Sequence, residues 1–290
     1  MVRAPTQTGR ACGTTTVITF LCWNLNRRPI RHRIGELARS RDVDVLILLE
    51  CAIEVGDLLG ALNEGNRPIF RYAPNRAEAP EESIKIFTRF PSEFLDPLED
   101  GTRYTVRHLR LPMCTDVVLA ALHLPSNLHS SESSQILACS QWAEMIAQVE
   151  RRAGHTRTVV VGDLNMNPFE AGVVGAGGFH ATMARAQALQ GQRTVSGQQY
   201  PFFYNPMWGC FGERDETPPG TYFYDSSEHV SYYWNMFDQV LLRPSLVDRL
   251  STTGIEIVTR AGAVSLLSAN GRPDKSVGSD HLPILFGLEL

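Results

Sequence analysis

The sequence predicts an α/β (α+β) fold in which β-sheets are flanked by helices. Short apolar, β-branched runs recur along the chain, and several are apolar at nearly every position, which is typical of strands covered on both faces. Helical patterns lie between some of these runs, without strict alternation. The runs expected to form strands are TTVITFLCW at 15–23, VDVLILLE at 43–50, IKIFTRF at 84–90, DVVLAALHL at 116–124, RTVVVGD at 157–163, FDQVLL at 237–242, GIEIVT at 254–259 and LPILFGLEL at 282–290.

Two segments have the periodicity of amphipathic helices. The first, 30–41, places Ile30, Ile34 and Leu37 on one face. The second, 131–152, opens with serines suited to an N-cap and stops before Gly154. Its expected apolar face consists of Ile136, Cys139, Trp142, Ala143, Ile146 and Val149.

The region from about 175 to 235 has the least regular pattern and is crowded with aromatic residues. We expect a long loop insertion there, because connections of that length are usually functional loops or lids. Its aromatic rings suit either local packing or stacking on bases. Residues 1–16 are expected to be a flexible N-terminal extension.

Composition is that of an ordinary soluble globular protein of 290 residues. The net charge of −4 gives no global basic field for non-specific nucleic-acid binding, although a local basic patch remains possible. The six cysteines contain no C-x-x-C pair, which favours reduced thiols over a disulfide framework or zinc site. No signal-peptide core or membrane-spanning run is seen, so a cytoplasmic location without stable membrane association is expected.

Polar residues able to bind metal or phosphate lie at the ends of the apolar runs. Any one of them has a mundane explanation as a solvated strand end. Strands that neighbour one another bring their ends to one rim, however, so the set predicts a shared site. Its members are Asn24, Asn26, Glu50, His123, Asp163, Asn165, Asp238, Asp280 and His281.

This set of residues suits the hydrolysis of a phosphate ester. Glu50 and other hard oxygen donors can hold Mg²⁺ or Mn²⁺, and Asp163 can orient or deprotonate a water. Asn165, Asn24 and His281 can hydrogen-bond the pentacovalent phosphate that develops during attack. Asp238 can orient His281, which leaves His123 to act on the leaving oxygen.

The ordered motifs WNLN (23–26), LILLE (46–50), HLPSN (123–127), GDLNMNP (162–168), FDQVLL (237–242) and SDHLPI (279–284) resemble the endonuclease/exonuclease/phosphatase superfamily. The resemblance implies a four-layer α/β sandwich, in which two mixed β-sheets pack face to face with helices on both outer sides, as a single domain over 17–290. It also implies a divalent-metal site at one edge. Glu50 would be a metal ligand, Asn24 or Asn26 a supporting residue of the metal site, and Asp280 a metal ligand or a residue behind one.

A nuclease acting on DNA or RNA is the first functional hypothesis, with nucleic acid as substrate and protein partners left open. The candidate substrate-binding residues are Arg27, Arg28, Arg89, Asn127, Tyr224 and Trp234. The alternatives are a phosphodiesterase or phosphatase of a sphingomyelin-like lipid, an inositol phosphate or a nucleotide, and a binding module that has lost catalysis. Glu82 is either an acid partner of His123 or a plain exposed carboxylate.

Overall fold

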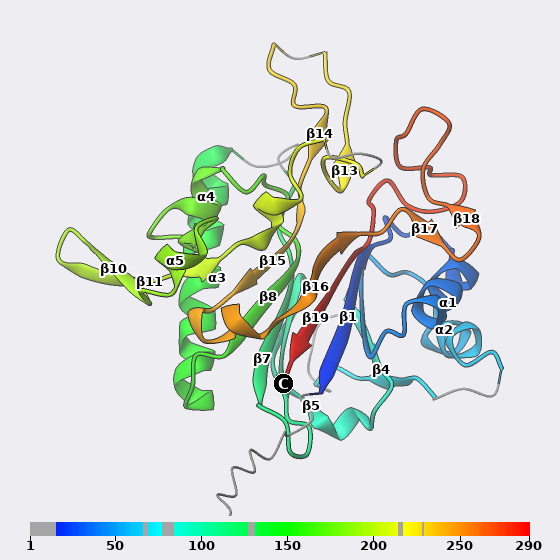
Figure 1. The fold of residues 1–290 in the computed structure, drawn as a ribbon, viewed down its shortest axis with the longest axis horizontal. Coiled ribbons are helices and arrows are strands. Elements are labelled where there is room, and N and C mark those ends of the chain that lie inside the picture. The colour runs from blue at the N-terminus through cyan, green and yellow to red at the C-terminus, as the bar shows by residue number, and fades with distance from the viewer. Residues whose placement is uncertain (1–15, 66–68, 77–83, 127–130, 214–216, 228) are drawn as a thin grey trace, which may run out of the picture.

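The computed structural model describes residues 16–65, 69–76, 84–126, 131–213, 217–227 and 229–290. Its centre is a pair of mixed β-sheets with six and seven strands (Figure 1). The six-stranded sheet has the order β16 (Leu250–Ile257), β19 (Ile284–Glu289), β1 (Val17–Asn24), β2 (Val45–Leu49), β4 (Lys85–Thr88) and β3 (Arg71–Ala73). The seven-stranded sheet has the order β5 (Leu95–Gly101), β6 (Tyr104–Leu109), β7 (Val117–His123), β8 (Thr158–Asp163), β15 (Asp238–Leu242), β12 (Phe203–Tyr204) and β9 (Ala181–Thr182).

Helices cover the outer sides of both sheets, so the predicted four-layer sandwich is confirmed (Figure 1). The helices α1 (Arg31–Ser40) and α2 (Val55–Leu62) lie beside the six-stranded sheet. On the other side lie α3 (Glu132–Ala153), α4 (Ala171–Val174) and α5 (Arg185–Ala188). Three 3₁₀ turns complete the helical elements of the described residues: η1 (Ser92–Phe94), η3 (Pro206–Gly209) and η4 (Pro244–Arg249).

The central strands are apolar throughout because their successive side chains pack alternately into two different cores. In β7, Leu119 and Ala121 belong to the core between the two sheets, whereas Val118 and Ala120 pack in a second core that includes residues of α3. Successive side chains of a strand point to opposite faces, so a strand with a layer on each side needs apolar residues at every position. Each run predicted as a strand overlaps a strand of the structure.

The long helix α3 begins and ends as predicted. The Ser131 side chain accepts a hydrogen bond from the Ser134 backbone N–H, and Gly154 ends the helix with a φ of 75°. The prediction of its apolar face is wrong at one residue: Ile136 is 39% exposed, and its neighbour Gln135 is buried instead. Gln135 donates from Nε2 to the carbonyl of Asn165, which accounts for a polar side chain on the inner face.

Much of the segment 175–235, where we expected a long loop insertion, forms short regular elements. A two-stranded hairpin forms from β10 (Gln192–Val195) and β11 (Gln198–Pro201). A second pairs β13 (Tyr222–Phe223) with β14 (Trp234–Asn235) and projects beyond the sandwich (Figure 1). A third small pair, β17 (Arg260–Ala261) and β18 (Val264–Ser265), lies outside this region.

The described cysteines are all free, and Cys22, Cys51 and Cys139 are buried. Within the same residues, no helix is long and apolar enough to cross a membrane.

The directions of the strands bring together the strand ends that carry the predicted site residues. β1 and β2 are parallel and both end at one edge of the sandwich, as do the parallel strands β7 and β8 of the other sheet. β15 and β19 are antiparallel to β8 and β1, so they begin at that same edge. Six strands from two sheets therefore deliver their terminal residues to one place.

Candidate active site

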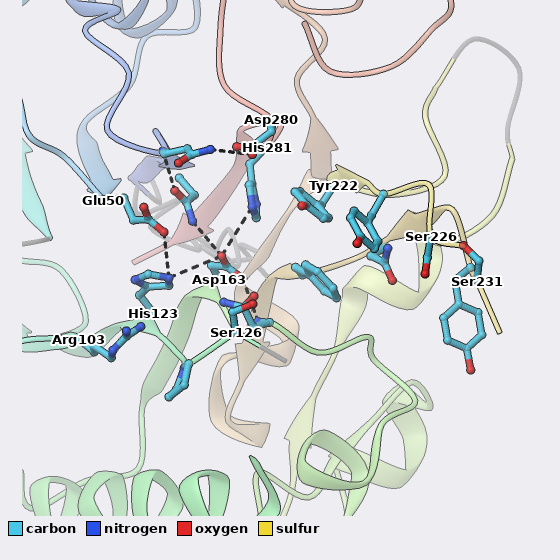
Figure 2. A pocket seen from close by; sticks show the side chains of 18 of the residues that line it. Glu50, Arg103, His123, Ser126, Asp163, Tyr222, Ser226, Ser231, Asp280 and His281 are labelled. Carbon is cyan, nitrogen blue, oxygen red and sulfur yellow. Dashed lines mark hydrogen bonds and ion pairs between the residues drawn. The ribbon is translucent and has the colours of Figure 1, made fainter. Parts of the chain in front are cut away.

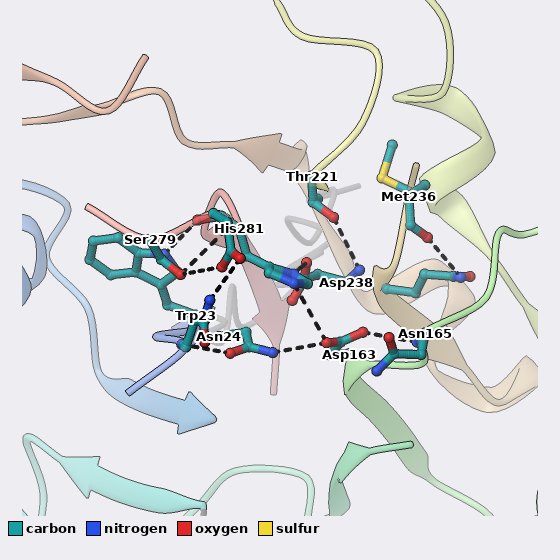
Figure 3. A network of polar contacts seen from close by, with 12 residues as sticks. Trp23, Asn24, Asp163, Asn165, Thr221, Met236, Asp238, Ser279 and His281 are labelled. Atoms are coloured by element: carbon teal, nitrogen blue, oxygen red, sulfur yellow. Dashed lines mark hydrogen bonds and ion pairs between the residues drawn. The ribbon is translucent and has the colours of Figure 1, made fainter. Parts of the chain in front are cut away.

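Asp163 lies at the centre of this edge and is almost fully buried (Figure 3). Its Oδ2 accepts a hydrogen bond from Asn24 Nδ2 at 2.8 Å, and its Oδ1 accepts one from the backbone N–H of Asn165 at 2.8 Å. Burial raises the pKa of the Asp163 carboxyl above its usual value, against the opposing attraction of His281. A carboxylate that is held by donors but costly to keep ionised is well suited to take a proton.

His281 and Asp238 form the predicted dyad. Nδ1 of His281 lies 2.8 Å from Oδ2 of Asp238, and both side chains are buried. Burial by itself lowers the pKa of His281, but the attraction of Asp238 and then of Asp163 outweighs it and raises the pKa to about 9. The ring is therefore protonated at neutral pH, with Nε2–H directed towards Asp163 (Figure 2).

The dyad is itself held in place from behind. Trp23 Nε1 donates to the backbone carbonyl of His281 at 2.8 Å, which ties the terminal strand to β1. The Thr221 hydroxyl accepts from the backbone N–H of Asp238 at 3.1 Å. The ring of Tyr222 lies against the His281 imidazole, with centroids 4.7 Å apart. Sequence patterns did not single out Trp23, Thr221 or Tyr222 for these roles.

His123 faces the same carboxylates from β7. Its Nε2 lies 3.3 Å from Glu50 Oε1 and 3.9 Å from Asp163 Oδ2. The Nε2 of His281 is 3.8 Å from the same Asp163 oxygen. Separations of 3.8 and 3.9 Å are too long for hydrogen bonds and leave room for an oxygen atom to bridge the groups.

Asn26 and Asp280 complete one side of the site. Asn26 Nδ2 donates to Asp280 Oδ2 at 2.7 Å, and Lys275 Nζ lies 3.3 Å from the same oxygen. Glu50, Asn26 and Asn165 all have positive φ, of 47°, 44° and 49°. For residues other than glycine this conformation costs about 1–3 kcal/mol each, and such strain clusters at functional sites.

These side chains open on a single pocket of about 700 Å³ (Figure 2). One end of the pocket is lined by the predicted site residues other than Asp238, and its other walls add further residues. The added lining residues include Arg103, Ser126, Tyr222, Ser226, Val230, Ser231, Tyr232, Asn235 and Phe237.

Of the proposed substrate-binding residues, only Tyr224 lines this pocket among those that the structure describes. Arg89 was placed wrongly: it pairs with Asp42 and Asp44, at the opposite end of the six-stranded sheet from Glu50. Trp234 packs edge-on against Phe223, with ring centroids 5.4 Å apart.

The two remaining arginines lie outside the pocket lining, near the loops of the same edge. The Arg27 backbone N–H donates to the Glu50 carbonyl, and Arg28 donates to the carbonyl of Lys275. Asn127 lies outside the described residues, as does Glu82, the suggested partner of His123.

The donor set of the pocket fits a hard divalent cation. Glu50, Asn26 and Asp280 offer carboxylate and amide oxygens, the ligands that Mg²⁺ and Mn²⁺ prefer. Among the described residues, no three His, Cys or acidic groups of this pocket bring their ligand atoms within 4.8 Å of one another. A sparse protein ligand set suits Mg²⁺, which usually keeps several of its waters.

Comparisons with known proteins agree with this architecture. Solved structures that match include the endonuclease domain of TRAS1, a telomere-specific non-LTR retrotransposon, at 15% identity and a TM-score of 0.52, covering 94% of this chain and 99% of that one. D. rerio TDP2 complexed with a single-strand DNA product matches at 13% identity and a TM-score of 0.53, covering 95% and 100%. A family protein from Bacteroides thetaiotaomicron matches at 13% identity and a TM-score of 0.58, covering 95% of each chain.

No curated protein matches this chain. A family model, however, matches residues 21–281, which is nearly the whole length and includes every predicted site residue from Asn24 to His281. The resemblance seen in the sequence motifs is thereby confirmed. The chain belongs to the endonuclease/exonuclease/phosphatase family.

Proposed function

We propose that this protein is a divalent-metal-dependent hydrolase of phosphodiester bonds that acts on nucleic acid. The observation that carries the proposal is the convergence of polar strand ends from both sheets around Asp163, at the base of one pocket. Members of this family typically use divalent metals, and the hard oxygen donors here fit Mg²⁺ or Mn²⁺.

Asp163 is the residue placed to activate water. The Nε2 atoms of His123 and His281 lie 3.9 and 3.8 Å from its Oδ2. A water between Oδ2 and either imidazole would contact the carboxylate and the ring nitrogen together. The hydrogen bonds from Asn24 Nδ2 and the Asn165 N–H keep the carboxylate in one orientation. General-base help of this kind contributes about 10²–10⁴-fold to a rate.

His281 supplies positive charge to the phosphate. With Nδ1 held by Asp238, the proton on Nε2 faces the pocket and can donate to a non-bridging oxygen as negative charge develops. The preorganised donor costs no reorientation during the reaction.

His123 and Asn165 complete the surroundings of the phosphate. His123 is positioned by Glu50 and lies on the opposite side of Asp163 from His281, which suits it to protonate the leaving oxygen (Figure 2). Asn165 Nδ2 donates to the Leu124 carbonyl, so its amide is held at the pocket wall. Glu50, with Asn26 and Asp280 beside it, would hold the divalent cation, which when bound supplies Lewis-acid stabilisation of phosphoryl charge.

Nucleic acid is favoured as substrate by the walls of the pocket beyond the catalytic end. Tyr222, Tyr224 and Tyr232 line it, and aromatic rings stack on bases with little regard to sequence. Arg103 lines the pocket next to His123 (Figure 2). It makes no side-chain ion pair with another described residue, so its guanidinium can contact a phosphate. A structural neighbour, D. rerio TDP2, has been solved with a single-strand DNA product.

A phospholipid headgroup is the second candidate, and the β13–β14 hairpin is the observation that favours it. Val230, Tyr232 and Tyr233 of this projecting segment are 63%, 57% and 51% exposed. Exposed aliphatic and aromatic side chains at a projecting tip suit contact with a membrane interface. Retention of the complete set of catalytic residues argues against a binding module without activity.

A substrate panel separates these candidates. The protein, with Mg²⁺ or Mn²⁺, is incubated with plasmid, single-stranded DNA, RNA, sphingomyelin vesicles, inositol phosphates and bis-p-nitrophenyl phosphate. The proposal predicts cleavage of DNA or RNA that stops with EDTA and returns with added metal. Intact nucleic acid together with a cleaved lipid or inositol ester would refute the nuclease assignment, and turnover unaffected by EDTA would refute the metal dependence.

A further inference from the structure

A second cluster of metal-binding side chains lies far from the catalytic edge. His108 is near the end of β6, Asp116 directly precedes β7, and His155 follows α3. β7 runs from this cluster to the catalytic edge, where His123 ends it. The seven residues of that strand place the two sites about 20 Å apart. The cluster is therefore separate from the Glu50 site.

The three ligand atoms have the spacing of a metal site. Asp116 Oδ2 is 3.1 Å from Nε2 of His108 and 3.1 Å from Nε2 of His155, and the two nitrogens are 3.4 Å apart. A cation with bonds of about 2.0–2.1 Å to all three atoms would sit about 0.9 Å outside their plane, with ligand–metal–ligand angles of about 98° and about 112°. The angle of about 98° occurs twice and that of about 112° once, so their mean of about 103° is nearer to the tetrahedral value than to the octahedral one.

The residues behind the cluster hold its carboxylate in place. The Arg157 side chain donates from Nε to the backbone carbonyl of Asp116 and from Nη2 to its Oδ1. The second oxygen, Oδ2, is left facing the two imidazoles. Hydrogen bonds that orient a ligating carboxylate in this way are a regular feature of metal sites. The His155 and His108 side chains are only 7% and 13% exposed, so the ligands are largely preformed.

One contact opposes metal binding. The backbone N–H of Arg157 donates to Nδ1 of His155 at 3.2 Å, so without metal the neutral ring carries its proton on Nε2. Coordination through Nε2 requires the other tautomer, so Arg157 loses this hydrogen bond and its N–H then faces the Nδ1–H of the ring. Metal binding must outweigh this loss, which lowers the affinity of the site.

We propose that His108, Asp116 and His155 form a zinc site that links β6, β7 and the segment after α3, with a water in the fourth position. Two imidazoles with one carboxylate are a ligand set that Zn²⁺ commonly takes and that binds Co²⁺ more weakly. The site joins three segments at the end of the seven-stranded sheet opposite the catalytic edge, so bound metal stabilises that end without taking part in hydrolysis.

The test uses the full chain carrying Glu50→Gln, which weakens the catalytic metal site. After EDTA treatment and removal of the chelator, Zn²⁺ binding is measured by equilibrium dialysis and thermal unfolding. We expect one Zn²⁺ per chain and a rise in Tm of about 5 °C at saturating metal. His108→Gln and His155→Gln, each added to this background, are expected to abolish both effects. His32→Gln, which changes an exposed histidine outside the cluster, is the matched control and is expected to change neither.

Circular dichroism in EDTA checks that each variant is folded. If a cluster variant does not fold, the Co²⁺-loaded Glu50→Gln protein decides the question: an intense visible spectrum typical of tetrahedral cobalt supports the site. A weak octahedral spectrum, no bound Zn²⁺, or equal binding by the His32→Gln and cluster variants would overturn the proposal.

Discussion

Replacing Asp238 with asparagine removes the negative charge that lies closest to His281 while keeping the shape of the buried side chain. The 2.8 Å contact to Nδ1 is the reason that the imidazole remains charged inside the protein. A pKa of about 9 against the ordinary 6.5 corresponds to about 3 kcal/mol in favour of the protonated ring. Burial, the largest single influence on the ring, acts in the opposite direction and persists in the variant.

We therefore expect the pKa of His281 to fall in Asp238→Asn, because burial still opposes the charge and its strongest opponent is gone. At pH 8, about 90% of the wild-type ring is protonated, and the protonated fraction is expected to be smaller in the variant. Loss of the charge and of the imposed tautomer is expected to lower kcat by about 10²–10⁴. The assay is the pH dependence of p-nitrophenol release from bis-p-nitrophenyl phosphate at saturating Mg²⁺. The alkaline limb should move from about pH 9 towards neutral pH in the variant.

The same pKa has a consequence for stability. The folded-state pKa of His281 lies above its unfolded value, so its ion pairing stabilises the fold fully below pH 6.5 and the stabilisation is lost as pH rises through about 9. Between pH 6 and pH 10, the free energy of unfolding measured in urea should fall more for the wild type than for Asp238→Asn. An alkaline limb at the same pH in both proteins would refute the assignment of charge to His281.

Three further changes test other parts of the structure. Glu50→Gln should raise the Mg²⁺ concentration needed for half-maximal activity by at least about 10-fold, because an amide is a weaker ligand than a carboxylate; an unchanged metal titration would remove Glu50 from the metal site. Trp23→Phe removes the 2.8 Å hydrogen bond to the His281 carbonyl, and should lower kcat by about 10-fold with little change in KM; equal kcat would show that the terminal strand holds the dyad unaided. Gly162→Ala should destabilise the fold by about 3 kcal/mol or more in urea unfolding, because its Cβ would lie 1.9 Å from the Leu122 carbonyl oxygen and its φ is +144°; a loss below about 1 kcal/mol would show that β7 and β8 can move apart.

The candidate catalytic residues were predictable because they follow strands whose sequence is distinctive. Continuous apolar runs such as those ending at Glu50, His123 and Asp163 have few other structural explanations. Their ends meet because β1, β2, β7 and β8 run in the same direction within their sheets. Family motifs then gave the order of the site residues along the chain.

Arg89 shows where such reasoning fails. It also follows an apolar run, but β4 is antiparallel to β2, so its end lies at the opposite edge from Glu50. The direction of a strand within a sheet depends on the connections made by the whole chain, and a local pattern does not contain it.

The strands that the sequence patterns did not predict have weaker local signals. The β5–β6 hairpin is formed by LDPLEDG, most of which is only half-buried, and YTVRHL, in which polar Thr105 and charged Arg107 are buried beside the apolar residues. The hairpins at 192–201 and 222–235 are largely polar or aromatic, so neither alternation nor an apolar run marks them. Arg103 was missed because it belongs to a turn, and its place beside His123 results from the pairing of β6 with β7.

The central claim is that the pocket around Asp163 cleaves phosphodiester bonds, and one comparison tests it most directly. Wild-type protein and Asp163→Asn are assayed under identical conditions with Mn²⁺ on a labelled single-stranded oligonucleotide, after circular dichroism has shown that both are folded. The account predicts cleavage by the wild type and a loss of at least about 10³-fold in the variant, since both water activation and the anchoring of Asn24 depend on this carboxylate. Cleavage at comparable rates by the two proteins would contradict it.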